Sequence, residues 1–278
     1  MSFISKGFLL SASLVILANS ALASTDTASF SSGYQSGPTN GIEEYKFGTS
    51  DSDIDVWVSG WSDSDASSDD GPGDNTLRDE NIVRYGSGWG IINADESDNQ
   101  PNHSADNIKS NDGSDDGTWR DYDFFLLDFD EKVTLESASF GWVNGAASNN
   151  QVTFIALNDG TNADNTQHDL NGVQIGQLQS MVMGGVGSGS GYSQVMGNNG
   201  SYYADVGFEK SSSLWIVGAF NSAFGGNSNL AGNDGFKLSG ISFSTSTPGG
   251  NTDIPEPAPL ALMLIALCCL VRQKSIKK

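Results

Sequence analysis

Short runs of alternating apolar and polar residues, separated by clusters of Gly, Asn, Asp and Ser, constrain the fold of this chain most strongly. The alternation is clear at 54–58 and 151–157, and side chains that alternate in this way point to opposite faces of a strand. No window of 11 or more residues in the body has the 3.6-residue period of an amphipathic helix. We therefore expect an all-β fold, an antiparallel β-sandwich of the jelly-roll type. Further strands are expected at 81–85, 122–129, 132–143, 172–178, 214–220 and 236–243.

One predicted strand, 132–143, changes its phase part of the way along. Val133 and Leu135 share one face, whereas Ala138 and Phe140 fall on the other. An extra residue in a strand shifts the alternation by one position, so a β-bulge near Glu136 and Ser137 would restore a common face. A bend between two sheets would have the same effect.

The amino terminus has the pattern of a secretory signal peptide. A basic residue precedes the apolar stretch 8–17, and Ala21 and Ala23 supply the small residues that signal peptidase requires. We expect cleavage before Ser24, which makes 1–23 the signal peptide.

The carboxyl terminus combines three elements. Pro255, Glu256 and Pro257 precede an apolar run at 260–271, and four basic residues follow that run. The run has 12 residues, whereas an α-helix needs about 20 to cross a membrane, so we expect a short transmembrane helix that anchors the protein transiently. The basic end places the body outside the cytoplasm.

The order of these three elements over 253–278 resembles the PEP-CTERM sorting signal of exosortase substrates in Gram-negative bacteria. The resemblance implies export, recognition by signal peptidase and then exosortase, and delivery to the cell surface or extracellular matrix. Segments at 102–107, 124–142 and 213–238 also look like one group of exosortase-dependent surface proteins. That group has no established activity, so this second resemblance implies a surface location and a shared domain. The expected organisation is then a signal peptide, an irregular lead-in at 24–50, a β-sandwich at 51–244, a linker at 245–252 and the sorting segment.

Charge and cysteine content limit the partners. The chain carries a net charge of −21, and a domain this acidic repels nucleic acids and anionic membrane surfaces. We expect contact with the membrane only through the C-terminal segment. Both cysteines, Cys268 and Cys269, lie in the apolar run, so no disulfide is expected in the body.

Calcium is the cofactor that the acidic clusters indicate. Asp112, Ser114, Asp116 and Asp123 occupy positions 1, 3, 5 and 12 of a 12-residue calcium-loop pattern. The alternative is a solvated acidic loop, because Asp and Gly are abundant in this chain.

A second calcium arrangement is also possible at the ends of the strands. Asp106 with Asn107, and Asn233 with Asp234, are expected to come together there, as in jelly rolls with a structural calcium.

Catalysis is not expected, because the chain has two histidines, no cysteine in the body and no Gly-x-Ser-x-Gly motif. We expect a structural or interaction protein of the cell surface or biofilm matrix. The alternative is a lectin-like carbohydrate-binding module that depends on calcium. For that module, Trp89 and Trp119 would be the exposed sugar contacts, because their surroundings are rich in Gly and Asp; core packing is the competing interpretation.

Overall fold

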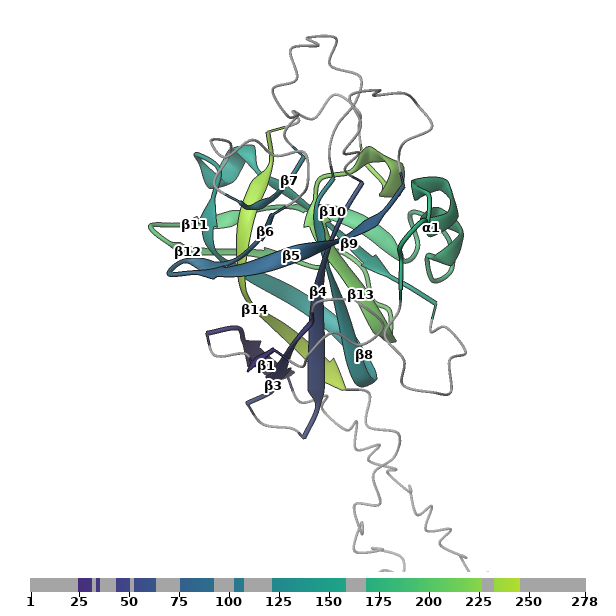
Figure 1. Ribbon diagram of the computed structural model, residues 1–278, viewed down its shortest axis with the longest axis horizontal. Helices are drawn as coiled ribbons and strands as arrows, with labels where there is room; N and C mark the ends of the chain where they lie inside the picture. The colour runs from purple at the N-terminus through teal and green to yellow at the C-terminus, as the bar shows by residue number, and fades with distance from the viewer. Residues whose placement is uncertain are drawn as a thin grey trace, which may run out of the picture.

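The computed structural model describes residues 25–31, 34–35, 44–50, 53–63, 76–92, 103–107, 122–158, 169–226 and 233–245 (Figure 1). Its elements, in chain order, are β1 (Thr25–Ser29), β2 (Tyr34–Gln35), β3 (Glu44–Gly48), β4 (Asp55–Ser62), β5 (Arg78–Tyr85), β6 (Gly88–Ile92), β7 (Ala105–Asp106), β8 (Phe124–Val143), η1 (Ala147–Asn149), β9 (Gln151–Ala156), α1 (Ile175–Met181), β10 (Ser190–Gln194), β11 (Met196–Asn198), β12 (Ser201–Asp205), β13 (Ser212–Ala219), η2 (Ser222–Phe224) and β14 (Gly235–Thr245).

The structure confirms the expected all-β, antiparallel architecture. The strands form one 14-stranded sheet, and neighbouring strands pair in antiparallel fashion. The alternating runs expected at 54–58, 81–85, 151–157, 214–220 and 236–243 correspond to β4, β5, β9, β13 and β14.

Strand β8 organises the sheet because it is 20 residues long and its two halves have different neighbours. The first half pairs with β4 and β13, and the second half pairs with β14 and β12. Strands β14, β6 and β5 connect the two halves through β4, so β8, β14, β6, β5 and β4 form a closed circuit.

The phase change predicted within β8 is confirmed as a bulge. Ser242 pairs with Ser137, and the next residue of β14, Phe243, pairs with Leu135, so Glu136 has no partner in the register. The extra residue lets Leu135 and Ala138 both point inward, and both side chains are buried.

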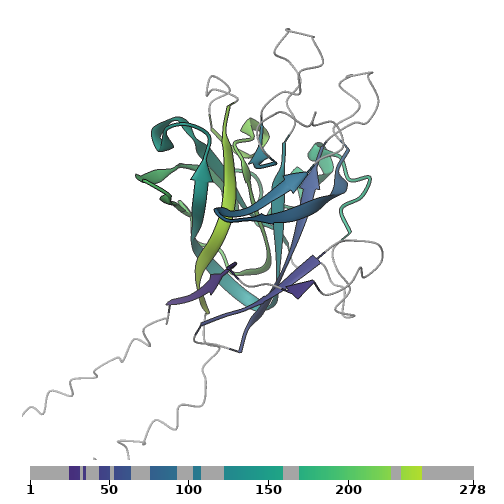
Figure 2. The same ribbon diagram turned by 60° about the vertical axis from the view of Figure 1, so that its left-hand side comes forward.

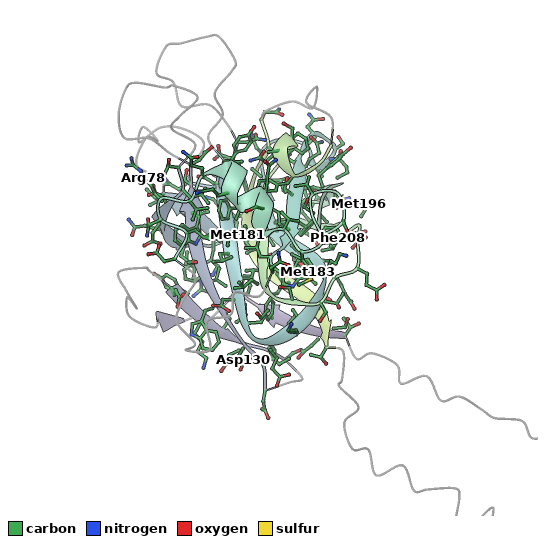
Figure 3. The ribbon with its side chains drawn as sticks, turned by 90° about the vertical axis from the view of Figure 1, so that its right-hand side faces the viewer. Arg78, Asp130, Met181, Met183, Met196 and Phe208 are labelled. Atoms are coloured by element: carbon green, nitrogen blue, oxygen red, sulfur yellow. The ribbon has the colours of Figure 1, made fainter. Side chains whose placement is uncertain are left out.

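The core occupies both faces of the first half of β8. Phe125 and Leu127 point into the main apolar cluster, whereas Phe124 and Leu126 point into a second cluster on the opposite face. The second cluster is covered by α1, whose Leu178 is 1% exposed (Figure 3). Burial on both faces explains why this part of β8 is continuously apolar.

The strand expected at 172–178 was wrong, since α1 covers most of that range. The Gln174 backbone N–H donates to the Gln177 side-chain oxygen at 2.9 Å, which satisfies a free donor at the start of the helix. Ile175 and Leu178 lie three residues apart and pack on the second cluster. The helix has only 7 residues, too few to produce a detectable period in the sequence.

The irregular lead-in expected at 24–50 was also wrong, because β1, β2 and β3 lie within it. In β1 the register places Thr25 opposite Ser244 of β14. Asp26 and Ala28 are the buried positions of β1. Because one of the two is a charged residue, the strand has no apolar face that a hydropathy pattern in the sequence could indicate.

The register of β1 with β14 also fixes where the chain enters and leaves the body. Both junctions lie at one end, the lower end in Figures 1 and 2, and β7 and the start of β14 lie at the other. We call this second end the loop end. The predicted signal peptide, 1–23, and the sorting segment, 253–278, lie outside the described residues. No helix within the described ranges is long and apolar enough to cross a membrane.

Candidate functional site

A buried network of Asp and Asn side chains lies at the loop end. Asn107 follows β7 and Asp234 precedes β14, and the structure confirms that these two positions come together. The Asn107 amide nitrogen donates to Asp234 Oδ2 and to the Phe220 carbonyl, both at 2.8 Å, and the Asp234 N–H donates to Asn107 Oδ1 at 2.9 Å. Asn107 and Asp234 are each 0% exposed, so these bonds form away from water.

The same network extends to β9. The second carboxylate oxygen of Asp234 accepts a hydrogen bond from the Gln151 N–H at the start of β9. Asn150 Oδ1 accepts from the Gly235 N–H at 3.0 Å, and the Asn150 amide donates to the carbonyls of Asn144 and Ala146. The starts of β9 and β14 are therefore held in a fixed relation.

Asp123, the twelfth position of the predicted calcium loop, belongs to this buried network. Its Oδ2 accepts from the Asp106 N–H at 3.3 Å, and its own N–H donates to the Asp106 carbonyl at 2.9 Å. Ser104 Oγ donates to Asp106 Oδ2 at 2.9 Å. All three residues are at most 2% exposed.

The other predicted ligands, Asp112, Ser114 and Asp116, lie outside the described residues. Within the described ranges, no group of three or more His, Cys, Asp or Glu side chains is arranged to hold a metal ion. The calcium loop stays a prediction.

At the loop end, several loops of the chain start or finish at the buried Asp and Asn network. The chain leaves the network at Asn107 and returns at Tyr122, and another connection returns at Asn233. A fully hydrogen-bonded buried base fixes the positions from which these connections start. Loops presented by a rigid scaffold are the usual carriers of binding function.

Trp89 is a core residue, so the prediction that it forms an exposed sugar contact was wrong. It is 4% exposed, and its indole N–H donates to the Phe30 carbonyl at 2.6 Å. The glycines beside it are not signs of an open loop. A Cβ at Gly90 would collide with the His103 carbonyl oxygen, so glycine there lets another segment pack directly against β6. Trp119 lies outside the described residues.

A cation–aromatic cluster that the sequence does not reveal surrounds Lys237. Its ammonium nitrogen lies 3.7 Å from the centre of the Tyr85 ring and 5.6 Å from that of Trp142. The His103 ring stacks beside Tyr85, with centres 6.3 Å apart. Lys237 is only 6% exposed, and this burial lowers the pKa of its ammonium. The residues come from β5, β8, β14 and the β7 approach, so only the fold brings them together.

Two carboxyls with raised pKa values, Glu44 and Asp128, lie on the face of the sheet shared by β3, β4 and β8. Glu44 is opposite Ser59, and Asp128 is opposite Trp57, two residues along β4 on the same face. Burial, followed by the nearby carboxylates of Asp128 and Asp79, raises the pKa of Glu44 to about 8. Burial, followed by Asp130, raises the pKa of Asp128 to about 7.

Exposed large apolar side chains lie on the three short strands β10, β11 and β12. Met196 of β11 is opposite Tyr203 of β12, and they are 40% and 43% exposed. Tyr192 of the neighbouring strand β10 is 41% exposed. Figure 3 shows Met196 and Phe208 on the same side of the molecule. Such side chains are candidates for contact with another molecule.

Comparisons of this chain with known proteins identify no relative. The chain matches no family model, no curated protein and no solved structure.

Proposed function

We propose that this chain is an exported structural or interaction protein of the cell surface or biofilm matrix, sorted by an exosortase through 253–278. The observation that carries the proposal is the order of the C-terminal elements: the Pro255-Glu256-Pro257 motif, an apolar run too short for a stable span, and a basic end. In this proposal, 1–23 directs export, and the C-terminal segment anchors the chain briefly in the inner membrane.

The arrangement of the body supports this proposal. The chain leaves β14 at the end where β1 begins, and β14 runs 11 residues from there to the loop end. At about 3.3 Å per residue, this strand spans roughly 35 Å. A tether that follows Thr245 would therefore hold the loop end away from the membrane.

The same proposal includes the type of β fold and a role without catalysis. We regard the closed circuit through β8 as a jelly-roll-like β-sandwich, in which the loop end is a display surface. The exposed side chains of Tyr192, Met196 and Tyr203 offer a further contact surface. Neither role requires a catalytic residue.

The sorting assignment is tested by replacing Pro255, Glu256 and Pro257 with alanine in the native host. We expect an unprocessed chain that stays in the membrane fraction, measured by fractionation and intact mass. The matched control replaces three linker residues, 247–249, with alanine and should be processed normally. Normal processing of the motif variant would refute the assignment. The mass of the mature wild-type protein also reports whether it begins at Ser24.

The second candidate function is a surface lectin, and the cluster around Lys237 favours it. Ligand sites combine aromatic side chains with a few placed polar or charged groups, and this cluster contains both. Because Trp89 is buried in the core, Trp119 is the one of the two predicted sugar contacts that remains a candidate. A glycan array with wild-type protein and Trp119→Ala tests it; binding that survives this change would place the sugar elsewhere.

A further inference from the structure

An open hollow of about 470 Å³ lies beside the Tyr85 ring. This volume lies within the roughly 300–1,000 Å³ typical of small-molecule sites. Five separate parts of the fold contribute to its wall: the end of β1, the β5–β6 turn, β8, the β11–β12 turn and β14. The lining residues that matter here are Ser29, Arg84, Tyr85, Gly86, Ser87 and Ser239.

The charge of this hollow is opposite to that of the protein. The whole chain has 34 acidic and 13 basic residues, yet Arg84 is the one charged side chain among the described residues that line the hollow. Arg84 is exposed, and it makes no ion pair within the described ranges. Lys237 adds a second positive charge behind the Tyr85 ring. The hollow is therefore locally positive on an acidic surface.

The rest of the wall supplies hydroxyl groups held at defined places. Ser29 Oγ donates to Ser31 Oγ at 3.2 Å, and both residues line the hollow. The Ser239 carbonyl accepts from the Phe30 N–H at 3.0 Å, which fixes the β1 end against β14. Hydroxyls both donate and accept, so they suit a ligand that is itself rich in hydroxyls.

The β5–β6 turn is fixed against the floor of the hollow. A Cβ at Gly141 of β8 would collide with the Ser87 carbonyl oxygen, so the turn lies directly on β8. Tyr85 is engaged by Lys237 and His103, which makes its ring a fixed wall. Gly86 faces open space, because nothing lies within 4 Å of a Cβ built there. The site is thus preformed, and the space at Gly86, one of its lining residues, is free.

We propose that this hollow binds an acidic saccharide, with the ligand carboxylate paired to Arg84 and the sugar hydroxyls bonded to the serine side chains. Guanidinium groups pair with carboxylates through two parallel hydrogen bonds, which gives both strength and orientation. The volume of the hollow exceeds that of a single inorganic anion. Such an anion would also leave most of the serine residues in the wall without a contact. The proposal deepens the proposed surface function, on which it rests, by naming a ligand class in an exopolysaccharide.

The experiment is a calorimetric titration of the detergent-solubilised full-length chain with tri-galacturonate. The probe is compared with its methyl ester, which keeps the shape and removes the charge, and with sodium sulfate. A buffer with 0.15 M salt shortens the Debye length to about 8 Å and screens the overall negative charge of the protein. We expect binding of tri-galacturonate, weaker binding of the ester and no competition by equimolar sulfate.

Two variants locate the site. Arg84→Gln should weaken tri-galacturonate binding by about 10- to 100-fold, because it removes a charge-assisted hydrogen bond, and leave ester binding unchanged. Gly86→Phe should abolish binding, because the ring would occupy the free space at this lining residue. Gly176→Phe is the matched control: Gly176 is also exposed with nothing within 4 Å, but it lies on α1.

Several results would overturn the proposal. No binding of tri-galacturonate at millimolar concentration removes the site, and binding that survives Gly86→Phe places the ligand elsewhere. Equal binding of the ester refutes the acidic class, and equal competition by sulfate refutes the saccharide. Because this titration uses purified protein and the sorting test follows processing in cells, either proposal can fail without the other.

Discussion

Asn107 and Asp234 exchange two hydrogen bonds across 127 positions of sequence, one from the Asn107 amide to Asp234 Oδ2 at 2.8 Å and one from the Asp234 N–H to Asn107 Oδ1 at 2.9 Å. The pair connects the end of β7 to the start of β14, at the base of the loop end. Because both side chains are fully buried, the loss of one partner leaves the other with unpaired polar atoms inside the protein.

Asn107→Ala should therefore destabilise the body strongly. The change leaves the Phe220 carbonyl and the Asp234 carboxylate each without one buried donor, at a cost of about 2–4 kcal/mol in the free energy of unfolding. We expect the melting temperature to fall by roughly 5–12 °C, measured by circular dichroism. Asn198→Ala, at an exposed position of β11, is the control and should melt close to wild type. Equal melting of the two variants would contradict a structural role for the network.

Gly141→Ala tests the contact between the β5–β6 turn and β8. The added methyl group would collide with the Ser87 carbonyl oxygen, so the turn must move away from β8. Such overpacking costs about 1–3 kcal/mol, which corresponds to a loss of roughly 3–10 °C in melting temperature. In Gly86→Ala, one residue from Ser87, the methyl group enters open space, and stability should be unchanged or slightly higher. If both variants melt alike, the close approach at Gly141 does not exist in solution.

Removal of divalent cations tests the predicted calcium loop. If calcium binds Asp112, Ser114 and Asp116 in the folded state alone, free calcium at 100 times its dissociation constant stabilises the fold by about 2.7 kcal/mol. Excess EDTA should then lower the melting temperature by several degrees, and added calcium should restore it. In Asp112→Asn/Asp116→Asn the EDTA effect should disappear. An identical melting temperature with and without EDTA in the wild type would eliminate the site.

The apolar-rich runs of the sequence predict five strands, β4, β5, β9, β13 and β14, because each of them buries most or much of its side chains. The bulge at Glu136 was predictable because it interrupts the alternation within β8. Strand β1 and helix α1 were not, because each is short and has few inward apolar residues. Their stability comes from the tertiary neighbours they pair with or cover.

Some features of the candidate sites were also predictable from the sequence, and others were not. Asp106, Asn107 and Asp234 were predictable as a group because polar residues next to the ends of paired strands lie at the same end of a sheet. The environment of Trp89 was not predictable, because glycine beside a tryptophan indicates an open loop as readily as a close approach of two segments. The position of Lys237 over Tyr85 depends on the register of three strands, which hydropathy does not encode.

The stability of this protein should decrease as the pH rises, because the fold raises the pKa values of Glu44 and Asp128. The pKa of Glu44 is raised to about 8 and that of Asp128 to about 7, chiefly by burial. The folded state therefore keeps protons that the unfolded chain releases above about pH 4. The resulting stabilisation is complete below the unfolded pKa values and is lost as the pH rises through the folded values, up to about 8.

Thermal melts at constant ionic strength should show a melting temperature about 5–10 °C lower at pH 9 than at pH 5. In Glu44→Gln/Asp128→Asn neither group titrates, so most of this difference should disappear. The double variant leaves the Lys46–Asp55 ion pair of the neighbouring residues, at 2.5 Å, unchanged. Asp205→Asn, at an exposed position of β12, is the matched control and should keep the wild-type slope. A double variant that also keeps this slope would show that the two buried carboxyls do not set the pH dependence.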